Sequence, residues 1–372
     1  MILIKHKNFA IHINDCVLER VVHRIDVHHH FIPPAYRDAM SRHGLHKVAG
    51  AALPEWSADA SLDVMNANAI QTALLSISAP GVYFGDVEEA RKLARQCNEY
   101  TAGLCDTYPG RFGSFAVLPM PFTEHACSET VHALDVLKAD GVVLLGSTEG
   151  KFLGAPEFDE LMAELDRRHA VVFVHPNLHR TSEELGLGAP GFLIEFLCDT
   201  TRAALNLMLT GTMERYPNIR WILAHAGGFL PYVAWRLSLA NLMPEYVSMV
   251  PAGVLTYIRR FHFDTALSPA AYPQAALREL VEPSQILFGS DFPFAPAPVT
   301  AMQRDALERS SVWSSEARAG IERGNALRLF PRFAGAGEHV ADVPAHDDGP
   351  LTSLKRAAAG ASVRLIDRLR DR

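Results

Sequence analysis

Residues that could bind a metal ion stand at the ends of short apolar runs. The first run ends in His28 and His30, two later runs end at His175 and His225, and Asp291 follows the last run. Residues two apart in an extended segment share a face, so we expect His28 and His30 to point the same way. Imidazole and carboxylate ligands suit zinc or another divalent ion, with one coordination position left for water or substrate.

Other histidines and one acid near these run ends have structural interpretations. The same two-residue alternation turns His29 away from its neighbours. His179 and His262 are expected to be hydrogen-bonded structural residues. Asp264 is open to two interpretations, a metal ligand or a carboxylate that orients a ligand, and the second is favoured. The metal prediction depends on four separate runs ending in metal-competent side chains, because one histidine at a strand end is weak support alone.

These side chains must be positioned by the elements that the runs predict. Eight short apolar runs alternate with longer amphipathic stretches such as 86–106 and 156–168. The runs are Val21–Val27, Thr72–Ile77, Phe112–Leu118, Gly141–Leu145, Val171–Val174, Ile219–Ala224, Phe261–Phe263 and Gln285–Phe288. Runs that are apolar nearly throughout are typical of parallel strands buried on both faces. An α/β fold, a (β/α)8 TIM barrel, is therefore predicted, with an open doubly wound sheet as the alternative.

The barrel is expected to span residues 21–330, with an extension at each end. Residues 1–20 form the N-terminal extension, and 331–372 form a C-terminal linker and tail helix. The tail helix is expected over Ser362–Arg372, where apolar residues repeat at helical spacing among arginines. The Gly- and Ala-bearing segment 40–56 is expected to cover the site. The carboxyl ends of the strands form the rim where barrel enzymes place their active sites.

Composition narrows the class of protein. The 372 residues carry a net charge of −7, which argues against nucleic-acid binding, and no apolar run is long enough to span a bilayer. Five scattered cysteines without a CxxC pair indicate neither a disulfide framework nor a zinc–thiolate site. The first fifteen residues carry charges where a signal peptide would be apolar. A soluble cytoplasmic enzyme acting on a small molecule is expected.

Four segments resemble those of the amidohydrolase-related, metal-dependent decarboxylases, the group that includes aminocarboxymuconate-semialdehyde decarboxylase. The segments are Ile25–His30, Val174–Pro176, Ala224–Gly228 and Gly289–Phe294. Three more resemble the 6-methylsalicylate decarboxylase branch, namely Pro54–Ser57, Leu75–Val82 and Asp199–Arg202. The resemblance covers roughly residues 22–330, and the two terminal extensions lie outside it.

The resemblance implies an amidohydrolase-type barrel with one divalent metal, zinc or manganese. It assigns the ligands to His28, His30, His175 and Asp291, and it places His225 beside the substrate as an acid/base. Arg236 matches a family arginine that reaches a substrate carboxylate in a neighbouring subunit, which implies a homodimer.

Two features of the strand-four region depart from related sequences. Lys151 lies six residues past the strand end, where many amidohydrolases carry a metal-bridging lysine, so a single metal is expected. Gly146-Ser147 and Gly154-Ala155-Pro156 differ from the pattern of close relatives on the loop at the active-site rim, which leaves the substrate open.

The resemblance implies nonoxidative decarboxylation of a small aromatic acid, an ortho-hydroxybenzoate such as 6-methylsalicylate. In this interpretation Asp291 also delivers the proton and His225 stabilises the phenolate. Two alternatives stay open. One is a hydrolase or hydratase of a lactone, amide or ester that uses a metal-bound hydroxide. The other is a barrel that keeps its metal without turnover and acts as a binding protein.

Overall fold

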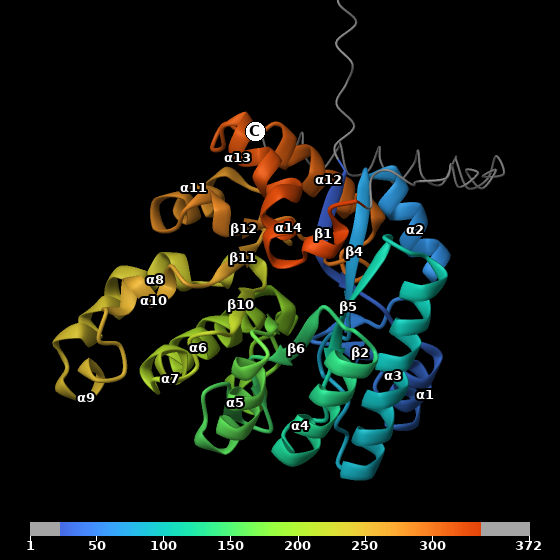
Figure 1. The fold of residues 1–372 in the computed structure, drawn as a ribbon, viewed down its shortest axis with the longest axis horizontal. Coiled ribbons are helices and arrows are strands. Elements are labelled where there is room, and N and C mark those ends of the chain that lie inside the picture. The colour runs from blue at the N-terminus through green and yellow to red at the C-terminus, as the bar shows by residue number, and fades with distance from the viewer. Residues whose placement is uncertain (1–22, 336–372) are drawn as a thin grey trace, which may run out of the picture.

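The computed structural model describes residues 23–335, and its centre is a sheet of eight parallel strands whose spatial order follows the chain. The strands are β1 (Arg24–His30), β4 (Ile70–Ser76), β5 (Phe112–Val117), β6 (Gly141–Leu145), β9 (Val171–His175), β10 (Arg220–Leu223), β11 (His262–Asp264) and β12 (Ile286–Leu287). Figure 1 shows the helices arranged around the outside of these strands. Because helices cover one face and the other faces the barrel interior, almost every strand residue is buried.

The two edges of the sheet meet. Val27 N–H donates to Phe288 O at 3.0 Å and His30 N–H donates to Phe292 O at 2.7 Å. His29 and Phe292 form a parallel bridge. These bonds join β1 to the segment after β12 and bring the sheet nearly to closure, which confirms the predicted (β/α)8 barrel over an open sheet.

Helices connect the strands, as the amphipathic stretches predict. The main helices are α1 (Pro34–Arg42), α2 (Ala58–Ala67), α3 (Val87–Thr107), α4 (Thr123–Val131), α5 (Asp159–Arg167), α6 (Glu195–Leu209), α8 (Leu230–Leu237), α11 (Ala271–Leu280), α12 (Ala297–Glu308) and α14 (Asn325–Leu329). Shorter ones are α7 (Thr212–Arg215), α9 (Pro244–Val247), α10 (Val254–Ile258) and α13 (Ser315–Ala319). Two small hairpins, β2–β3 (Lys47–Val48, Ala51–Ala52) and β7–β8 (Ser147–Thr148, Lys151–Phe152), lie outside the barrel sheet.

The first strand is shifted from its predicted position. The sequence predicts a strand over 21–27, whereas β1 runs from Arg24 to His30. Its last residues stay extended because His29 and His30 pair with Leu75 and Ser76 of β4. The other predicted strands differ from the observed ones by at most two residues at either end. The predicted extension 1–20 and the tail helix 362–372 lie outside the described residues.

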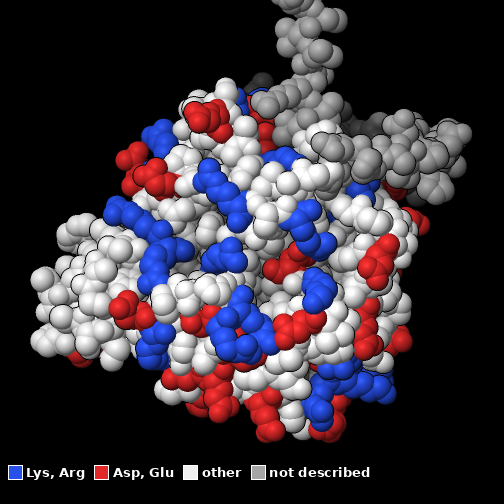
Figure 2. All heavy atoms as spheres, viewed as in Figure 1, with Lys and Arg blue, Asp and Glu red and all other residues white. Residues whose placement is uncertain are grey.

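A lobe built from α8, α9 and α10 projects at the left of Figure 1. The space-filling view shows that this lobe carries few charged side chains, whereas charges are spread over the rest of that face (Figure 2). The exposed apolar side chains there define the α8–α9 apolar face, namely Tyr232, Trp235, Leu239, Leu242, Met243 and Val247. In the part of the chain that the structure describes, no helix is long and apolar enough to cross a membrane.

Candidate metal centre and active site

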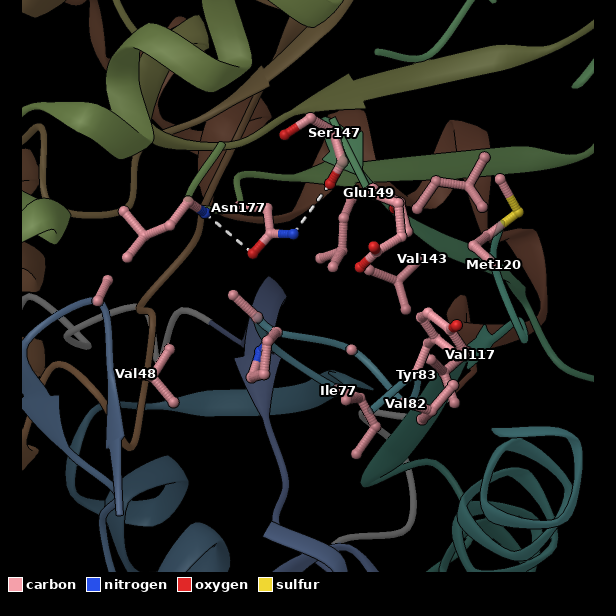
Figure 3. A pocket seen from close by; sticks show the side chains of 18 of the residues that line it. Val48, Ile77, Val82, Tyr83, Val117, Met120, Val143, Ser147, Glu149 and Asn177 are labelled. Carbon is pink, nitrogen blue, oxygen red and sulfur yellow. Dashed lines mark hydrogen bonds between the residues drawn. The ribbon is translucent and has the colours of Figure 1, made fainter. Parts of the chain in front are cut away.

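Two adjoining cavities open at the carboxyl ends of the strands. One, which we call the metal-site cavity, has a volume of about 410 Å³ and is lined by His175, His225 and Asp291 together with mostly apolar side chains. The other, of about 470 Å³, lies over the ends of β4, β5 and β6 (Figure 3). Val48 of the β2–β3 hairpin lines both cavities. The segment 40–56 therefore covers the site, as the sequence predicts.

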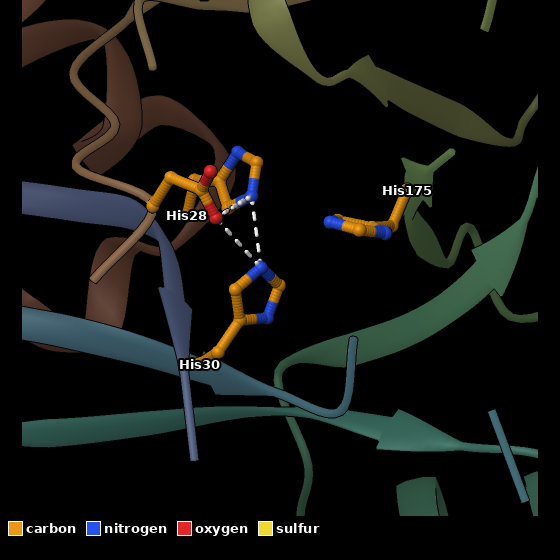
Figure 4. A group of neighbouring side chains, drawn as sticks. His28, His30 and His175 are labelled. Atoms are coloured by element: carbon orange, nitrogen blue, oxygen red, sulfur yellow. Dashed lines mark hydrogen bonds and ion pairs between the residues drawn. The ribbon is translucent and has the colours of Figure 1, made fainter. Parts of the chain in front are cut away.

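Four side chains converge at the predicted metal position. His28, His30, His175 and Asp291 each offer a ligand atom, and these atoms lie within 4.8 Å of one another. The three rings point toward one common space (Figure 4). The two Nε2 atoms of His28 and His30 are 3.0 Å apart, and Asp291 Oδ1 lies 3.3 and 3.2 Å from them. All four residues are buried.

The opposite nitrogen of each ring is held by an acceptor. His28 Nδ1–H donates to Asp264 Oδ2 at 2.7 Å, His30 Nδ1–H donates to the Ser76 carbonyl at 3.1 Å, and His175 Nδ1–H donates to the Pro176 carbonyl at 2.8 Å. A carboxylate or a carbonyl can only accept, so the proton of each neutral ring sits on Nδ1. Such partners fix the tautomer and the direction of a metal-binding imidazole.

These residues fit a divalent cation. Once every Nδ1 carries the proton, each neutral ring turns an Nε2 lone pair toward the centre, where the Asp291 carboxylate adds negative charge. Lone pairs 3.0 Å apart repel each other unless a positive charge lies between them. Three imidazoles and one carboxylate match the ligand types of a mononuclear zinc or manganese site.

The protonation equilibria of the protein without metal show the same need for positive charge. Burial disfavours the charged form of His28, but the carboxylates of Asp264 and Asp291 outweigh burial and raise the pKa of His28 to about 10. Burial lowers the pKa of His30 and, more strongly, of His175. Although burial alone would raise the pKa of Asp291, the charge of the neighbouring His28 and its hydrogen bond hold that pKa well below its usual range. A proton on His28 thus occupies the charge position that a metal ion would take.

Asp264 orients two of the site histidines. Its Oδ2 accepts the hydrogen bond from the His28 ring. Its Oδ1 accepts hydrogen bonds from the backbone N–H groups of His225 and Ala266, at 2.9 and 3.0 Å. Both oxygens are therefore engaged by donors, which agrees with the favoured sequence interpretation of a carboxylate that orients a ligand.

His225 stands beside the cluster and lines the metal-site cavity. It follows β10 in a tight turn at φ 53°, and its ring centroid lies 4.9 Å from that of His28. Burial and the charge of His28 lower the pKa of His225, so its ring is neutral at pH 7. A neutral imidazole in this position can accept a proton from water or substrate.

Sequence reasoning missed Asp26. This buried carboxylate accepts from His28 N–H at 3.1 Å and from the backbone N–H and hydroxyl of Ser290 at 3.0 and 2.5 Å. It also accepts from His29 Nδ1–H at 3.0 Å. Asp26 therefore ties β1 to the turn that carries Asp291. The available signal was an acidic residue inside an otherwise apolar strand, where burial of a carboxylate requires several donors.

Helix α6 forms hydrogen bonds with both the loop that follows β9 and the loop that follows β10. Its buried Asp199 accepts from Asn177 N–H at 2.8 Å and from the Ser147 hydroxyl at 2.5 Å. Two residues further along the helix, Thr201 Oγ1 accepts from Phe229 N–H at 2.8 Å. Asn177 lies two residues after His175, and Phe229 lies four residues after His225. The helix therefore braces the segments that carry both histidines.

Arg236 is not brought into either cavity of the described chain. It is exposed on α8, between Trp235 and Leu237 and beside the α8–α9 apolar face. A role for Arg236 in the metal site of its own subunit is therefore not supported. Its neighbours on that surface include the exposed Tyr232 and Trp235.

The fold and the His/Asp cluster together define a metal-dependent barrel hydrolase or lyase, and the amidohydrolase family profile matches residues 25–332. The chain belongs to this family. It is 37% identical over 318 residues to the 6-methylsalicylic acid decarboxylase of Penicillium expansum, covering 84% of this chain and 97% of that protein.

Two solved structures share the fold. An amidohydrolase II is 31% identical with a TM-score of 0.77, over 83% of this chain and 99% of its own. A dihydroxybenzoic acid decarboxylase from Polaromonas sp. JS666, solved with bound manganese and the inhibitor 2-nitroresorcinol, is 24% identical with a TM-score of 0.72, over 83% of this chain and 97% of its own.

Proposed function

We propose that this chain is a metal-dependent, nonoxidative decarboxylase of a small aromatic acid, an ortho-hydroxybenzoate such as 6-methylsalicylate. The observation that carries the proposal is the convergence of His28, His30, His175 and Asp291 in a cavity that is otherwise mostly apolar. Such a cavity suits an aromatic ring whose carboxylate faces the cluster. The name of the Penicillium relative supports the same reaction and substrate class.

The proposed metal ligands are the same four residues. When bound, the metal supplies Lewis-acid chemistry at the carboxylate and the adjacent phenolic oxygen of the substrate. Histidine and carboxylate suit both zinc and manganese. Manganese is favoured by the bound ion of the Polaromonas structure.

Asp291 is the proposed proton carrier. Its Oδ1 faces the two histidines, and its low pKa means that the resting residue is a carboxylate. It therefore first takes the phenolic proton of the substrate and then delivers it to the ring carbon that bears the carboxyl group. The carbon–carboxyl bond breaks, carbon dioxide leaves, and its electron pair restores the aromatic ring. Protonation first avoids a bare aryl anion.

His225 is proposed to stabilise the phenolate that forms during these reaction steps. Its neutral ring lines the cavity beside the cluster. If the substrate were a lactone or an ester, His225 would instead remove a proton from water, which is the hydrolytic alternative. Carbon dioxide is released in the first reaction, and water is gained in the second.

The proposal is tested by product mass spectrometry with metal-quantified protein. A panel of ortho-hydroxybenzoates including 6-methylsalicylate, together with several lactones, is incubated with and without a chelator. We expect loss of carbon dioxide from at least one acid, abolished by chelation and restored by manganese or zinc. Gain of water by a lactone without any decarboxylation would replace the proposal with the hydrolase, and bound metal with no turnover would favour the binding protein.

A homodimer is the proposed assembly, with Arg236 reaching the substrate carboxylate in the partner subunit. Two observations support this. No lysine or arginine lines the described metal-site cavity, so that cavity offers the substrate carboxylate no lysine or arginine side chain of its own. Tyr232 and Trp235 beside Arg236 are 88% and 75% exposed, and large exposed aromatic groups of this kind mark interfaces. A cytoplasmic location likewise remains a prediction, testable by cell fractionation.

A further inference from the structure

The cavity over β4, β5 and β6 has an apolar floor and a polar rim. Its floor includes Ile77, Val117 and Val143, which are all buried, and Figure 3 shows them around the open space. Its rim carries the exposed Glu149 and Arg180 and the partly exposed Asn177, whose Nδ2 donates to the carbonyl of the buried Ser147. Polar groups therefore meet solvent at the mouth, while the interior offers hydrocarbon contacts.

This cavity adjoins the metal site at two side chains. Val48 and Phe196 line both cavities, and both are more than nine-tenths buried. Two residues that line the second cavity are also close in sequence to residues of the metal site. Ile77 directly follows Ser76, whose carbonyl holds His30, and Asn177 lies two residues after His175. The Val48 and Phe196 side chains therefore stand where the metal-site cavity borders the second space.

We propose that the second cavity receives the alkyl substituent of the aromatic acid, so that the substrate class extends to hydroxybenzoates with chains longer than methyl. This inference rests on the proposed function and deepens it. The carboxylate and phenolic oxygen face the His/Asp cluster, the ring lies in the metal-site cavity, and the chain passes Val48 and Phe196 to reach Ile77, Val117 and Val143.

The physical reason is the chemistry of the floor. A cavity of about 470 Å³ with an apolar floor holds water that makes few hydrogen bonds there. Each methylene that displaces such water gains about fourfold in affinity, the factor that corresponds to about 0.8 kcal/mol. The charged groups Lys47, Glu149 and Arg180 stay at the rim, so an uncharged chain is preferred over a second carboxylate inside.

The test is a chain-length series of 6-alkylsalicylates carrying methyl, propyl and pentyl groups. In the wild-type protein we expect kcat/KM to hold or rise from methyl to pentyl. Val143→Phe places an aromatic ring in the floor and should lower the pentyl-to-methyl ratio of kcat/KM at least tenfold. Val117→Phe, from the neighbouring strand, gives a second filling variant in case one of them fails to fold, as judged by thermal unfolding.

Two further Val→Phe variants are the controls. Val299→Phe fills the metal-site cavity and should lower kcat/KM for every chain length. Val136→Phe is on the surface, where Val136 is 62% exposed, and should keep the wild-type pentyl-to-methyl ratio. A wild-type protein that rejects propyl and pentyl, or filling variants that leave the ratio at the wild-type value, would overturn the inference.

Failure of this inference is separable from failure of the proposed function. Titration calorimetry with the same acids measures binding to the manganese-loaded protein without turnover. If no acid loses carbon dioxide but affinity rises with chain length and falls in Val143→Phe, the cavity assignment stands and the decarboxylase proposal fails. If carbon dioxide is released while affinity is independent of chain length, only the cavity assignment fails.

Discussion

At the level of single residues, the Nδ1 partners decide what the histidines can do. Asp264 and the carbonyls of Ser76 and Pro176 fix the protons of three rings on the side away from the centre. The Nε2 lone pairs are then available to one cation without any change of rotamer. A ligand set positioned in this way binds metal without first reorganising, which favours both affinity and a fixed substrate geometry.

Asp291→Asn is expected to abolish turnover. An amide cannot take the phenolic proton and return it to the ring carbon, so carbon dioxide release should fall at least about a thousandfold. Thermal unfolding should stay close to wild type because the shape is unchanged. Carbon dioxide assays and metal analysis check this, and retained activity would remove Asp291 from both of its proposed roles.

His29→Ala is expected to keep the metal but to destabilise the protein. The two-residue alternation suggests a nearly silent change, yet His29 is buried between Asp26 and the Ser61 hydroxyl, at 3.0 Å from each. Its loss leaves a cavity and unpaired buried groups, which costs about 2–4 kcal/mol of unfolding free energy. Urea unfolding and metal analysis measure the two effects. Loss of metal at unchanged stability would mean that His29 is a ligand.

At the level of elements, β1 and α6 do the positioning. β1 supplies two ligands, and Asp26 within it holds the turn that carries Asp291. α6 bonds to the loops after β9 and β10 through Asp199 and Thr201. A ligand histidine at a strand end needs such support because the loop that follows has no backbone hydrogen bonds to neighbouring strands.

Asp199→Ala is expected to lower kcat at least about tenfold, because Asn177 N–H and the Ser147 hydroxyl lose their acceptor and the His175 loop relaxes. Asp199→Asn should restore most of the activity, since the amide oxygen accepts from Asn177 while its NH₂ donates to Ser147. The kinetics of both variants at saturating metal provide the measurement. Equal loss in Ala and Asn would show that the charge, not the hydrogen bonding, is needed.

Asp199 should also give stability a dependence on pH. Burial raises the pKa of Asp199 from 3.8 to about 6, against the hydrogen bonds from Ser147 and Asn177. Between these values the folded protein binds more protons than the unfolded chain, so the contribution of Asp199 is greatest below pH 4 and is lost as pH rises through 6. The advantage of wild type over Asp199→Asn should shrink by about 2 kcal/mol from pH 4 to pH 7.

Urea unfolding of chelator-treated wild type and Asp199→Asn across this range measures the effect. Both proteins contain the same metal ligands. The titration of these ligands therefore cancels in the difference between the two unfolding free energies. An advantage that stays constant with pH would place the Asp199 pKa near its ordinary value.

At the level of the whole molecule, the lobe with few charged side chains in Figure 2 and the position of Arg236 lead to a prediction about the dimer. Arg236→Ala should lower kcat/KM, and Trp235→Asp should yield monomers by light scattering because a buried charge disfavours the interface. In a dimer with a shared site, Arg236→Ala impairs both sites of its own homodimer, and Asp291→Asn inactivates both sites of its own.

Mixing these two variants tests the shared site directly. A mixed dimer regains one complete site, with Asp291 from one subunit and Arg236 from the other. Random exchange should therefore restore about a quarter of wild-type activity. No recovery, with exchange confirmed by mass spectrometry, would place Arg236 outside the partner's site.

The barrel and the place of the His/Asp cluster could be predicted from the pattern of residues along the chain. Buried parallel strands must be apolar on both faces, so their positions are visible as runs, and polar residues at their ends stand out. Because every strand of such a barrel ends at one rim, residues as distant as His28 and Asp291 could be expected to meet.

The remaining features arise from packing between elements that are distant along the chain. The shift of β1 and its irregular register between Asp26 and His29 arise from pairing with β4 and with the turn after β12. The roles of Asp26, Asp264 and Asp199 depend on which donors lie near them, and these donors come from residues as many as 264 positions away. The second cavity is likewise space left between side chains of different elements. Contacts of this kind are set by packing distances that no local pattern of residue types encodes.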